Sequence, residues 1–297
     1  MNAFLFPGQG SQSVGMGRVW CEQYPELNDY FDRASKVLSL DLRQLCFEGP
    51  QETLTQTENA QPALLTVGVI CAEVARKRGL TAQMLAGHSL GEYTALVAGG
   101  VLEFEGAVEL VRQRAALMAA AAPGAMAAIV GMKDEQVAEV VQTSSEEGIL
   151  VAGNFNAPGQ VVISGEIPAV EAARQLAKSH GAKMTVLLPV SGAFHSPLMA
   201  PAAAKMEELI NAAPFADAAI PIFQNTTAQP ATKAGNLRAA LIAQMTGAVR
   251  WSEIIANMIA GGASQFYELG PGSVLSGLCR RIDKSVKCET ADSWTSG

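Results

Sequence analysis

Short apolar runs alternate with longer amphipathic segments through the first part of the chain. This alternation is typical of an α/β sheet, in which short buried strands are covered by helices. The runs that predict strands are residues 3–6 and 84–86. The segments that predict helices are residues 16–58 (with polar breaks), 61–78, 93–97 and 104–121. Pro62 fits the first turn of the helix over 61–78, and Lys77 and Arg78 fit its last turn.

The pattern changes after Pro123-Gly124. The elements predicted beyond this point are strand 125–132, helix 134–145, strands 151–156 and 160–164, helix 168–180 and strand 184–190. Their β-α-β-β-α-β order is that of a ferredoxin-like fold. We therefore predict a small ferredoxin-like subdomain over 124–190, inserted into a large domain made of residues 1–123 and 191–297.

The remaining segments return to the pattern of the large domain. They predict helices over 198–212, 236–245, 251–261 and 273–282, and strands over 220–223 and 265–269. The tail from Lys284 is polar, so we expect it to be loosely held. The fold class that this organisation predicts is α/β: an α/β-hydrolase-like parallel-sheet domain with the inserted subdomain.

Composition narrows the classes of function. Hydrophobic residues make up 49% of the chain and charged residues 16%, which indicates a compact globular protein. The formal net charge of -7 argues against a general nucleic-acid binder.

The chain also gives no targeting or metal signal. Its first residues have no basic segment, so they predict no signal peptide, and the apolar stretch 115–132 is cut by Pro123-Gly124, so it predicts no membrane span. The five cysteines are scattered, without a Cys-x-x-Cys motif or zinc-ligand spacing. We expect a cytoplasmic protein with no metal.

The strongest candidate for chemistry is the Gly-x-Ser-x-Gly motif centred on Ser89. An apolar run leads into it and an amphipathic segment follows, as in a strand–turn–helix nucleophile elbow. Side chains at Gly87 and Gly91 would collide in such a turn. The helix after the serine would direct its free N–H groups at negative charge that develops there. The alternative is a serine in a glycine-rich turn without chemistry.

A serine nucleophile needs a base, and the chain has three histidines. The ring of His88, inside the elbow, should diverge from Ser89, and His180 lies in a polar helix end. His195 follows a predicted strand in a glycine- and proline-bounded loop, where a base is expected. The alternative for His195 is a satisfied core histidine.

No carboxylate stands in an obvious position to orient that histidine. Asp217 lies in a predicted turn, and Glu268 precedes a Gly-Pro-Gly segment. A backbone carbonyl can also orient an imidazole, so a Ser–His dyad is an open possibility. Arg114 lies among apolar helix neighbours, where it could bind a carboxylate in a pocket or extend along the surface as a solvated arginine.

Several separated segments together resemble one family, the malonyl-CoA:acyl carrier protein transacylases. That family includes the discrete acyltransferases of type II fatty acid synthases and of trans-acting polyketide synthases. The segments run in the family's order from residue 4 to about 282: Phe6-Pro7-Gly8-Gln9-Gly10-Ser11-Gln12, Gly87-His88-Ser89-Leu90-Gly91-Glu92-Tyr93, Arg114 before Met118, Asn154-Phe155-Asn156 with Gln160-Val161-Val162-Ile163-Ser164-Gly165, Gly192-Ala193-Phe194-His195-Ser196, Val249-Arg250-Trp251 and Gly270-Pro271-Gly272-Ser273-Val274-Leu275.

The resemblance implies a role for each matching residue. Ser89 would take the acyl group as an ester, with His195 as its base and later as the acid for the leaving thiolate. The resemblance also implies an oxyanion hole from the backbone N–H groups of Gln9 and Leu90, and malonyl carboxylate binding by Arg114. The backbone carbonyl of Arg250 would orient His195. Further substrate contacts would come from Phe194, Gln61 and Asn156. Phe194 would crowd a branched acyl group, which favours malonyl over methylmalonyl.

The function expected from these residues is a ping-pong acyltransferase. It would move malonyl from malonyl-CoA to the phosphopantetheine thiol of an acyl carrier protein, in fatty acid or polyketide biosynthesis. No cofactor is expected, nor nucleic acid or membrane as a partner, and the protein is expected to be a monomer. Arg280, Arg281 and Lys284 are candidates for docking the acidic carrier. The alternatives are an acyl hydrolase of the same fold and a non-catalytic scaffold.

Overall fold

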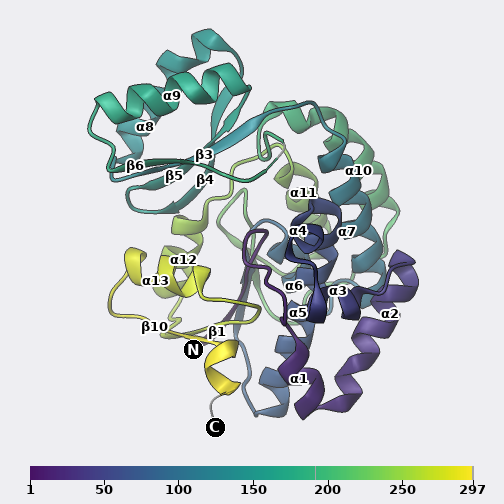
Figure 1. Cartoon of the computed structure of the whole chain (residues 1–297). Helices are drawn as coiled ribbons and strands as arrows, with labels where there is room; N and C mark the ends of the chain where they lie inside the picture. Colours follow the sequence, from purple (N-terminus) through teal and green to yellow (C-terminus); the bar gives the residue numbers. More distant parts are fainter. Residues whose placement is uncertain (191, 296–297) are drawn as a thin grey trace.

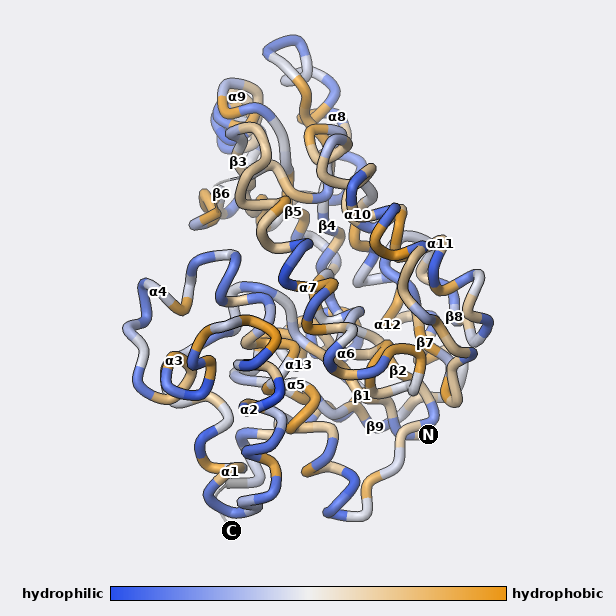
Figure 2. Tube along the Cα trace, turned by 90° about the vertical axis from the view of Figure 1, so that its right-hand side faces the viewer, coloured by the Kyte–Doolittle hydropathy of each residue, from blue (hydrophilic) through white to orange (hydrophobic). Residues whose placement is uncertain are grey.

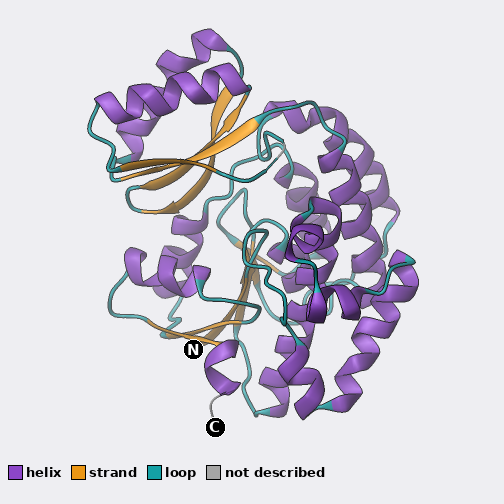
Figure 3. Ribbon diagram, in the orientation of Figure 1, coloured by secondary structure: helices purple, strands orange, loops and turns teal. Residues whose placement is uncertain are grey.

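The computed structural model describes residues 1–190 and 192–295, and it contains two separate sheets (Figures 1 and 3). The larger sheet has the strand order β10-β9-β1-β2-β7-β8. Its strands are β1 (Asn2–Phe6), β2 (Met84–Gly87), β7 (Ile222–Phe223), β8 (Pro230–Ala231), β9 (Gln265–Glu268) and β10 (Lys287–Thr290). All neighbours pair in parallel except β7 and β8. The prediction of an α/β fold with a parallel-sheet core is confirmed.

The second sheet is antiparallel, in the order β4-β5-β3-β6. Its elements follow one another as β3 (Ala125–Val130), α8 (Asp134–Ser144), β4 (Leu150–Ala157), β5 (Gln160–Gly165), α9 (Ile167–Ser179) and β6 (Met184–Leu187). The two helices lie together on one side of this sheet (Figure 1), around a core of small and β-branched residues. The predicted small subdomain spans this unit, and Ser191, where the second part of the large domain was predicted to start, lies outside the described residues.

Helices surround the larger sheet (Figure 3). They are α1 (Arg18–Gln23), α2 (Asn28–Leu38), α3 (Leu42–Glu48), α4 (Gln51–Thr55), α5 (Thr57–Lys77), α6 (Gly91–Ala98), α7 (Phe104–Ala119), α10 (Ala200–Ala212), α11 (Ala234–Gln244), α12 (Trp251–Ala260) and α13 (Val274–Ile282). Much of α5 is hydrophobic (Figure 2) and buried, because it is covered by α6 and α7. No helix in the described part of the chain is long and apolar enough to cross a membrane.

The start of α5 differs from the prediction. The helix begins at Thr57, so Pro62 lies in its second turn and the predicted first-turn position is wrong. The sequence prediction placed residues 57 and 58 in the preceding helical segment and a break before residue 61, whereas α5 runs through all of these positions. Thr57 and Ala60 are buried, and their packing extends the buried face of the helix toward its N-terminus.

The C-terminal tail is also better held than its polarity suggested. Residues 287–290 form β10, which pairs in parallel with β9 at the edge of the larger sheet. Trp294 follows in a short 3-10 helix, with its ring 6.4 Å from that of Trp20 and 6.1 Å from that of Tyr267. The expectation of a loosely held tail is therefore wrong. β10 is an edge strand with only one neighbouring strand, so part of it faces solvent. Polar residues are common in such strands for that reason.

Candidate active site

The loop between β2 and α6 has the geometry of a nucleophile elbow. Ser89 has a φ of 51°, in the left-handed region that non-glycine residues rarely adopt. A Cβ on Gly87 would lie 1.9 Å from the backbone of Gly91, and a Cβ on Gly91 would lie 2.0 Å from the carbonyl oxygen of Phe6. Both glycines are thus required by close backbone approaches, as the motif predicted.

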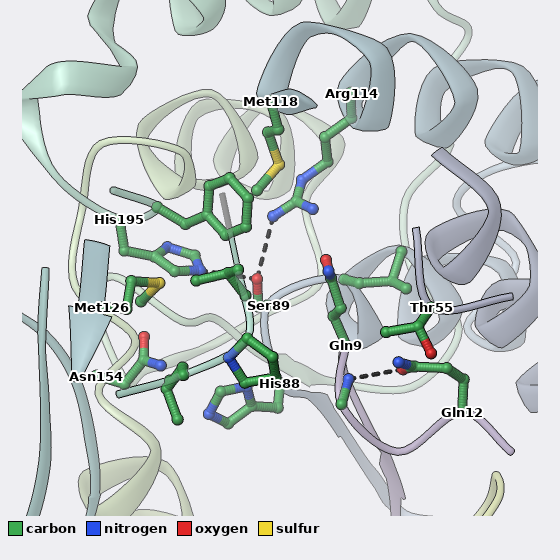
Figure 4. A pocket seen from close by; sticks show the side chains of 16 residues that line it. Gln9, Gln12, Thr55, His88, Ser89, Arg114, Met118, Met126, Asn154 and His195 are labelled. Atoms are coloured by element: carbon green, nitrogen blue, oxygen red, sulfur yellow. Dashed lines mark hydrogen bonds between the residues drawn. The ribbon is translucent and has the colours of Figure 1, made fainter. Parts of the chain in front are cut away.

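Ser89 and His195 meet at this turn. The Oγ of Ser89 lies 2.8 Å from Nε2 of His195, although the two residues are far apart in the sequence (Figure 4). On the other side of the ring, Nδ1 lies 3.0 Å from the carbonyl oxygen of Gln244 and 3.1 Å from that of Gly247. Both carbonyls can only accept, so the proton is on Nδ1 and Nε2 is free to accept from the serine hydroxyl.

The assignment of Arg250 as the residue that orients His195 is therefore wrong. The Arg250 carbonyl accepts from the N–H of Ile254 at 3.0 Å, as part of the first turn of α12. Gln244 is instead the last residue of α11, where helix carbonyls have no partner within the helix and remain available. The imidazole thus takes its orientation from the end of α11 and the turn after it.

The environment of His195 keeps its imidazole neutral. The residue is buried, and this burial, together with the positive charge of Arg114, lowers the pKa of His195 to about 3. A neutral imidazole with a bare Nε2 can take a proton from Ser89 near neutral pH. The pair therefore has the protonation state and the contact that a general base and a nucleophile require.

The other two histidines form no hydrogen bond with Ser89 among the described residues. Nε2 of His88 lies 2.8 Å from Oδ1 of Asn156, so this ring is engaged with the small subdomain and does not contact Ser89. His180 is exposed at the end of α9. The assignment of Asn156 to substrate contact is not borne out by this geometry, because its side chain is bonded to His88 and it is absent from the residues that line the cavity described below.

Arg114 is buried beside the dyad. Its side chain projects from α7 toward Ser89 (Figure 4), and only 1% of it is exposed, so the alternative of a solvated surface arginine is wrong. Nη2 donates to Oγ of Ser89 at 3.1 Å and to Oε1 of Gln244 at 3.0 Å. Nη1 donates to Oε1 of Gln61 at 2.6 Å, whereas Nε has no partner among the described residues. Burial lowers the pKa of Arg114, but a guanidinium keeps its charge in a protein.

Gln61 contacts Arg114 and does not line the cavity described below. Its Oε1 accepts from Arg114, and its Nε2 lies near the sulfur of Met118 and Oε1 of Gln9. It is fully buried and does not line the cavity, so its assignment to direct substrate contact is corrected to a contact with Arg114.

A cavity of about 170 Å³ opens in front of Ser89. It is smaller than the roughly 300–1,000 Å³ of sites for drug-sized ligands, which suits a short acyl group. The large domain and the small sheet both line it, through Gln9, Gly10, Gln12, Thr55, His88, Ser89, Leu90, Arg114, Met118, Met126, Asn154, Leu188, Pro189, Val190, Phe194 and His195. Phe194 thus lies where a substrate residue was predicted, and Met126 and Asn154 are lining residues that the sequence reasoning missed.

Gln9 and Leu90 flank the serine at the wall of this cavity. Their backbone N–H groups donate to no acceptor within the described residues. Free N–H groups beside a nucleophile are what an oxyanion hole needs, and that role for this pair stays a prediction.

Asn225 is a further residue of the site that the sequence reasoning missed. Its Oδ1 accepts from the N–H of Ser89 at 2.7 Å, and its Nδ2 donates to the carbonyl of Gly87 at 2.7 Å. This amide holds both sides of the elbow in its strained conformation. The available signal was its position just after β7, at the carboxyl end of a parallel strand, where site residues gather.

The candidate carboxylates lie outside the dyad. Glu268 is buried and accepts from the N–H groups of Leu275 and Ser276 at the start of α13. Asp217 bonds to Lys233 on the surface. Within the described ranges, no group of three or more His, Cys, Asp or Glu side chains could hold a metal ion.

Comparison with known families supports the interpretation of the site. Residues 3–293 match the family described as the acyl transferase domain. The malonyl CoA-acyl carrier protein transacylase of Bacillus subtilis (strain 168) is 48% identical over 289 residues, which cover 96% of this chain and 91% of that protein. The enzyme of the same description from Escherichia coli (strain K12) is 43% identical over 284 residues, covering 94% of this chain and 92% of that protein.

Solved structures agree with this likeness. The acyl-carrier-protein S-malonyltransferase of Bartonella henselae superposes with a TM-score of 0.95 at 41% identity, covering 98% of this chain and 95% of that one. A malonyl-transacylase solved in complex with its type II PKS acyl-carrier protein superposes with a TM-score of 0.94 at 38% identity, covering 97% of this chain and 95% of that one.

Proposed function

Because this chain belongs to the acyl transferase domain family, we propose that it is a malonyl-CoA:acyl carrier protein S-malonyltransferase working through an acyl ester on Ser89. The observation that carries the mechanism is the convergence of Arg114 and His195 on one hydroxyl, at 3.1 Å and 2.8 Å. A dyad alone would serve many acyl transfers, whereas a buried cation at the nucleophile favours an acyl group that carries its own carboxylate.

In the first half-reaction, Arg114 binds the malonyl carboxylate in the cavity. The proton of Ser89 passes to Nε2 of His195 as Oγ attacks the thioester carbon. The N–H groups of Gln9 and Leu90 stabilise the negative oxygen of the tetrahedral intermediate. The C–S bond then breaks, His195 returns its proton to the leaving sulfur, and coenzyme A departs with a free thiol.

The second half-reaction runs the same chemistry in reverse. The phosphopantetheine thiol of the carrier protein gives its proton to His195 and attacks the ester carbon. The bond to Oγ of Ser89 breaks, and His195 returns the proton to that oxygen. His195 exchanges protons with Ser89 and with the two thiols, and the steps involve no change of oxidation state, so the proposed reaction requires neither a metal nor a redox cofactor.

Transfer is favoured over the two alternatives. A hydrolase that releases acyl groups to water has no need of a buried cation in contact with its nucleophile. A scaffold has no need of a neutral, hydrogen-bonded imidazole at the same place. The relatives reported above are described as transacylases, which supports transfer for this chain as well.

Intact-mass spectrometry after mixing with malonyl-CoA tests the covalent step. We expect one added malonyl group on the unaltered protein and none on Ser89→Ala. A purified carrier protein should then remove the malonyl group, which appears on its phosphopantetheine thiol. Rapid release of free malonate without any carrier would favour the hydrolase, and the same added mass on Ser89→Ala would refute the acyl-serine.

We infer a monomer that works in the cytoplasm and serves a fatty acid or polyketide carrier. All five cysteines are free thiols, which suits a reducing compartment. A panel of carrier proteins from the two kinds of pathway, tested for malonyl transfer under one set of conditions, identifies the natural acceptor by its kcat/KM.

A further inference from the structure

Glu92 is a buried carboxylate that takes no part in the reaction steps above. It is the second residue of α6, three positions after the nucleophile, and 2% of it is exposed. Burial raises the pKa of Glu92 to about 7, although a hydrogen bond from Gln244 opposes this shift. Its Oε2 accepts that bond from Nε2 of Gln244 at 2.6 Å.

Gln244 connects Glu92 with Ser89, His195 and Arg114. Its backbone carbonyl accepts from Nδ1 of His195 at 3.0 Å, and its Oε1 accepts from Nη2 of Arg114 at 3.0 Å. Its Nε2 donates both to Glu92 and to the backbone carbonyl of Ser89, the latter at 2.9 Å. One residue thus contacts the nucleophile, the base and the cation.

The direction of the Gln244 amide decides whether these contacts can form. A side-chain amide has one accepting oxygen and one donating nitrogen. Arg114 can only donate, so it requires the oxygen to face it. The Ser89 carbonyl can only accept, and Oε2 of Glu92 accepts in the observed contact, so both require the nitrogen on the opposite side. A reversed amide would place its NH₂ against the guanidinium and its oxygen against two other oxygens.

We propose that Glu92 is a positioning residue for acyl selection, which fixes the Gln244 amide so that its oxygen holds Arg114 in place for the substrate carboxylate. This inference rests on the proposed function. Gln61 anchors Nη1 and Gln244 anchors Nη2, so these two amides set the plane of the guanidinium. Loss of the second anchor leaves Arg114 charged and buried but free to turn about Nη1. Binding of an acidic acyl group then suffers more than the chemistry at Ser89.

Two variants test the proposal, one at each end of the Glu92–Gln244 contact. Glu92→Leu removes the acceptor with little change in volume. Gln244→Met removes the amide but keeps the backbone carbonyl that orients His195. We expect the ratio of kcat/KM for malonyl-CoA over acetyl-CoA to fall about tenfold or more in both, which is what one hydrogen bond to a charged group is worth. The change should lie mainly in KM for malonyl-CoA.

Two further variants serve as controls. Glu92→Gln keeps an oxygen that can accept from Gln244, so it should retain most of the malonyl preference. Gln224→Met removes another buried glutamine amide, one that donates to the carbonyl of Asn236 away from the cavity, and it should leave the ratio unchanged. Thermal unfolding of each variant separates lost selectivity from lost stability.

Equal losses with malonyl-CoA and acetyl-CoA in Glu92→Leu and Gln244→Met would show a structural role only and would overturn the inference. Should Glu92→Leu fail to fold, the same ratio in Gln244→Met decides. If the unaltered protein transfers malonyl and both variants keep its preference, the inference alone fails. If the unaltered protein does not transfer malonyl at all, the proposed function fails and the inference goes with it.

Discussion

Nη2 of Arg114 lies 3.1 Å from Oγ of Ser89, so the cation proposed to bind the acyl carboxylate also contacts the nucleophile. In a malonyl group a single CH₂ separates the carboxylate from the thioester carbonyl. A carboxylate held by Arg114 therefore brings the reacting carbon to the serine. Under the proposed function, one side chain would therefore both select and position the substrate.

Replacement of this arginine is expected to invert the acyl preference. Arg114→Ala should lower kcat/KM for malonyl-CoA by about a hundredfold or more, since it removes the charged group proposed to bind the malonyl carboxylate, and should raise transfer from acetyl-CoA. Steady-state kinetics with both donors measures the change. Arg112→Ala, an exposed arginine of the same helix that is bonded to Glu109, is the matched control and should change neither rate. An unchanged preference in Arg114→Ala would remove Arg114 from the site.

The buried imidazole should influence how stability depends on pH. The pKa of His195 falls from 6.5 to about 3 in the folded protein, so between these values the unfolded chain binds the extra proton. Its contribution to the free energy of unfolding is thus fully present above about pH 6.5 and is lost as pH falls toward 3. Urea unfolding of His195→Gln between pH 4 and pH 7 should show a weaker rise of stability with pH than the unaltered protein. Parallel curves would contradict the assigned burial of a neutral histidine.

The elbow should tolerate no side chain at its second glycine. In Gly91→Ala the new Cβ would lie 2.0 Å from the Phe6 carbonyl oxygen, so β1 and α6 must separate. We expect the variant to lose about 2–4 kcal/mol of stability, as for other severe core overpacking, and to lose malonyl loading. Gly106→Ala is the control, because this helical glycine of α7 has no atom near its Cβ position and should gain about 0.5–1 kcal/mol. Urea unfolding and intact mass measure both effects.

Carrier docking was predicted at the basic end of α13. Arg281 donates to Oε1 of Gln160 at 2.9 Å and so connects α13 with the small sheet, which makes it unsuitable for a clean test. Combined reversal of Arg280 and Lys284 to glutamate should raise KM for the acidic carrier several-fold and leave KM for malonyl-CoA unchanged. Lys36→Glu on α2, across the molecule in Figure 1, is the control. Equal effects on both substrates would refute docking at this surface.

The sequence predicted the residues that a local motif can specify. The Ser89 elbow rests on close backbone contacts between glycines, and those contacts require a particular residue type. The orienting carbonyl for His195 could not be found in this way, because every residue carries a carbonyl and only the chain path decides which one is free. Gln244 ends a helix whose sequence gives no sign of a site. The tail was missed because a polar edge strand has the composition of a loop.

Arg114 is held by the oxygens of two neutral amides, Gln61 and Gln244, and in the described ranges no carboxylate bonds to it. An acidic substrate therefore does not have to displace a hydrogen-bonded carboxylate of the protein from Arg114. Burying this cation without a hydrogen-bonded carboxylate lowers the free energy of unfolding. A glutamate introduced at position 61 or 244 would form an ion pair with Arg114 inside the protein and would compete with the substrate carboxylate. The resulting protein should keep its fold and lose its activity.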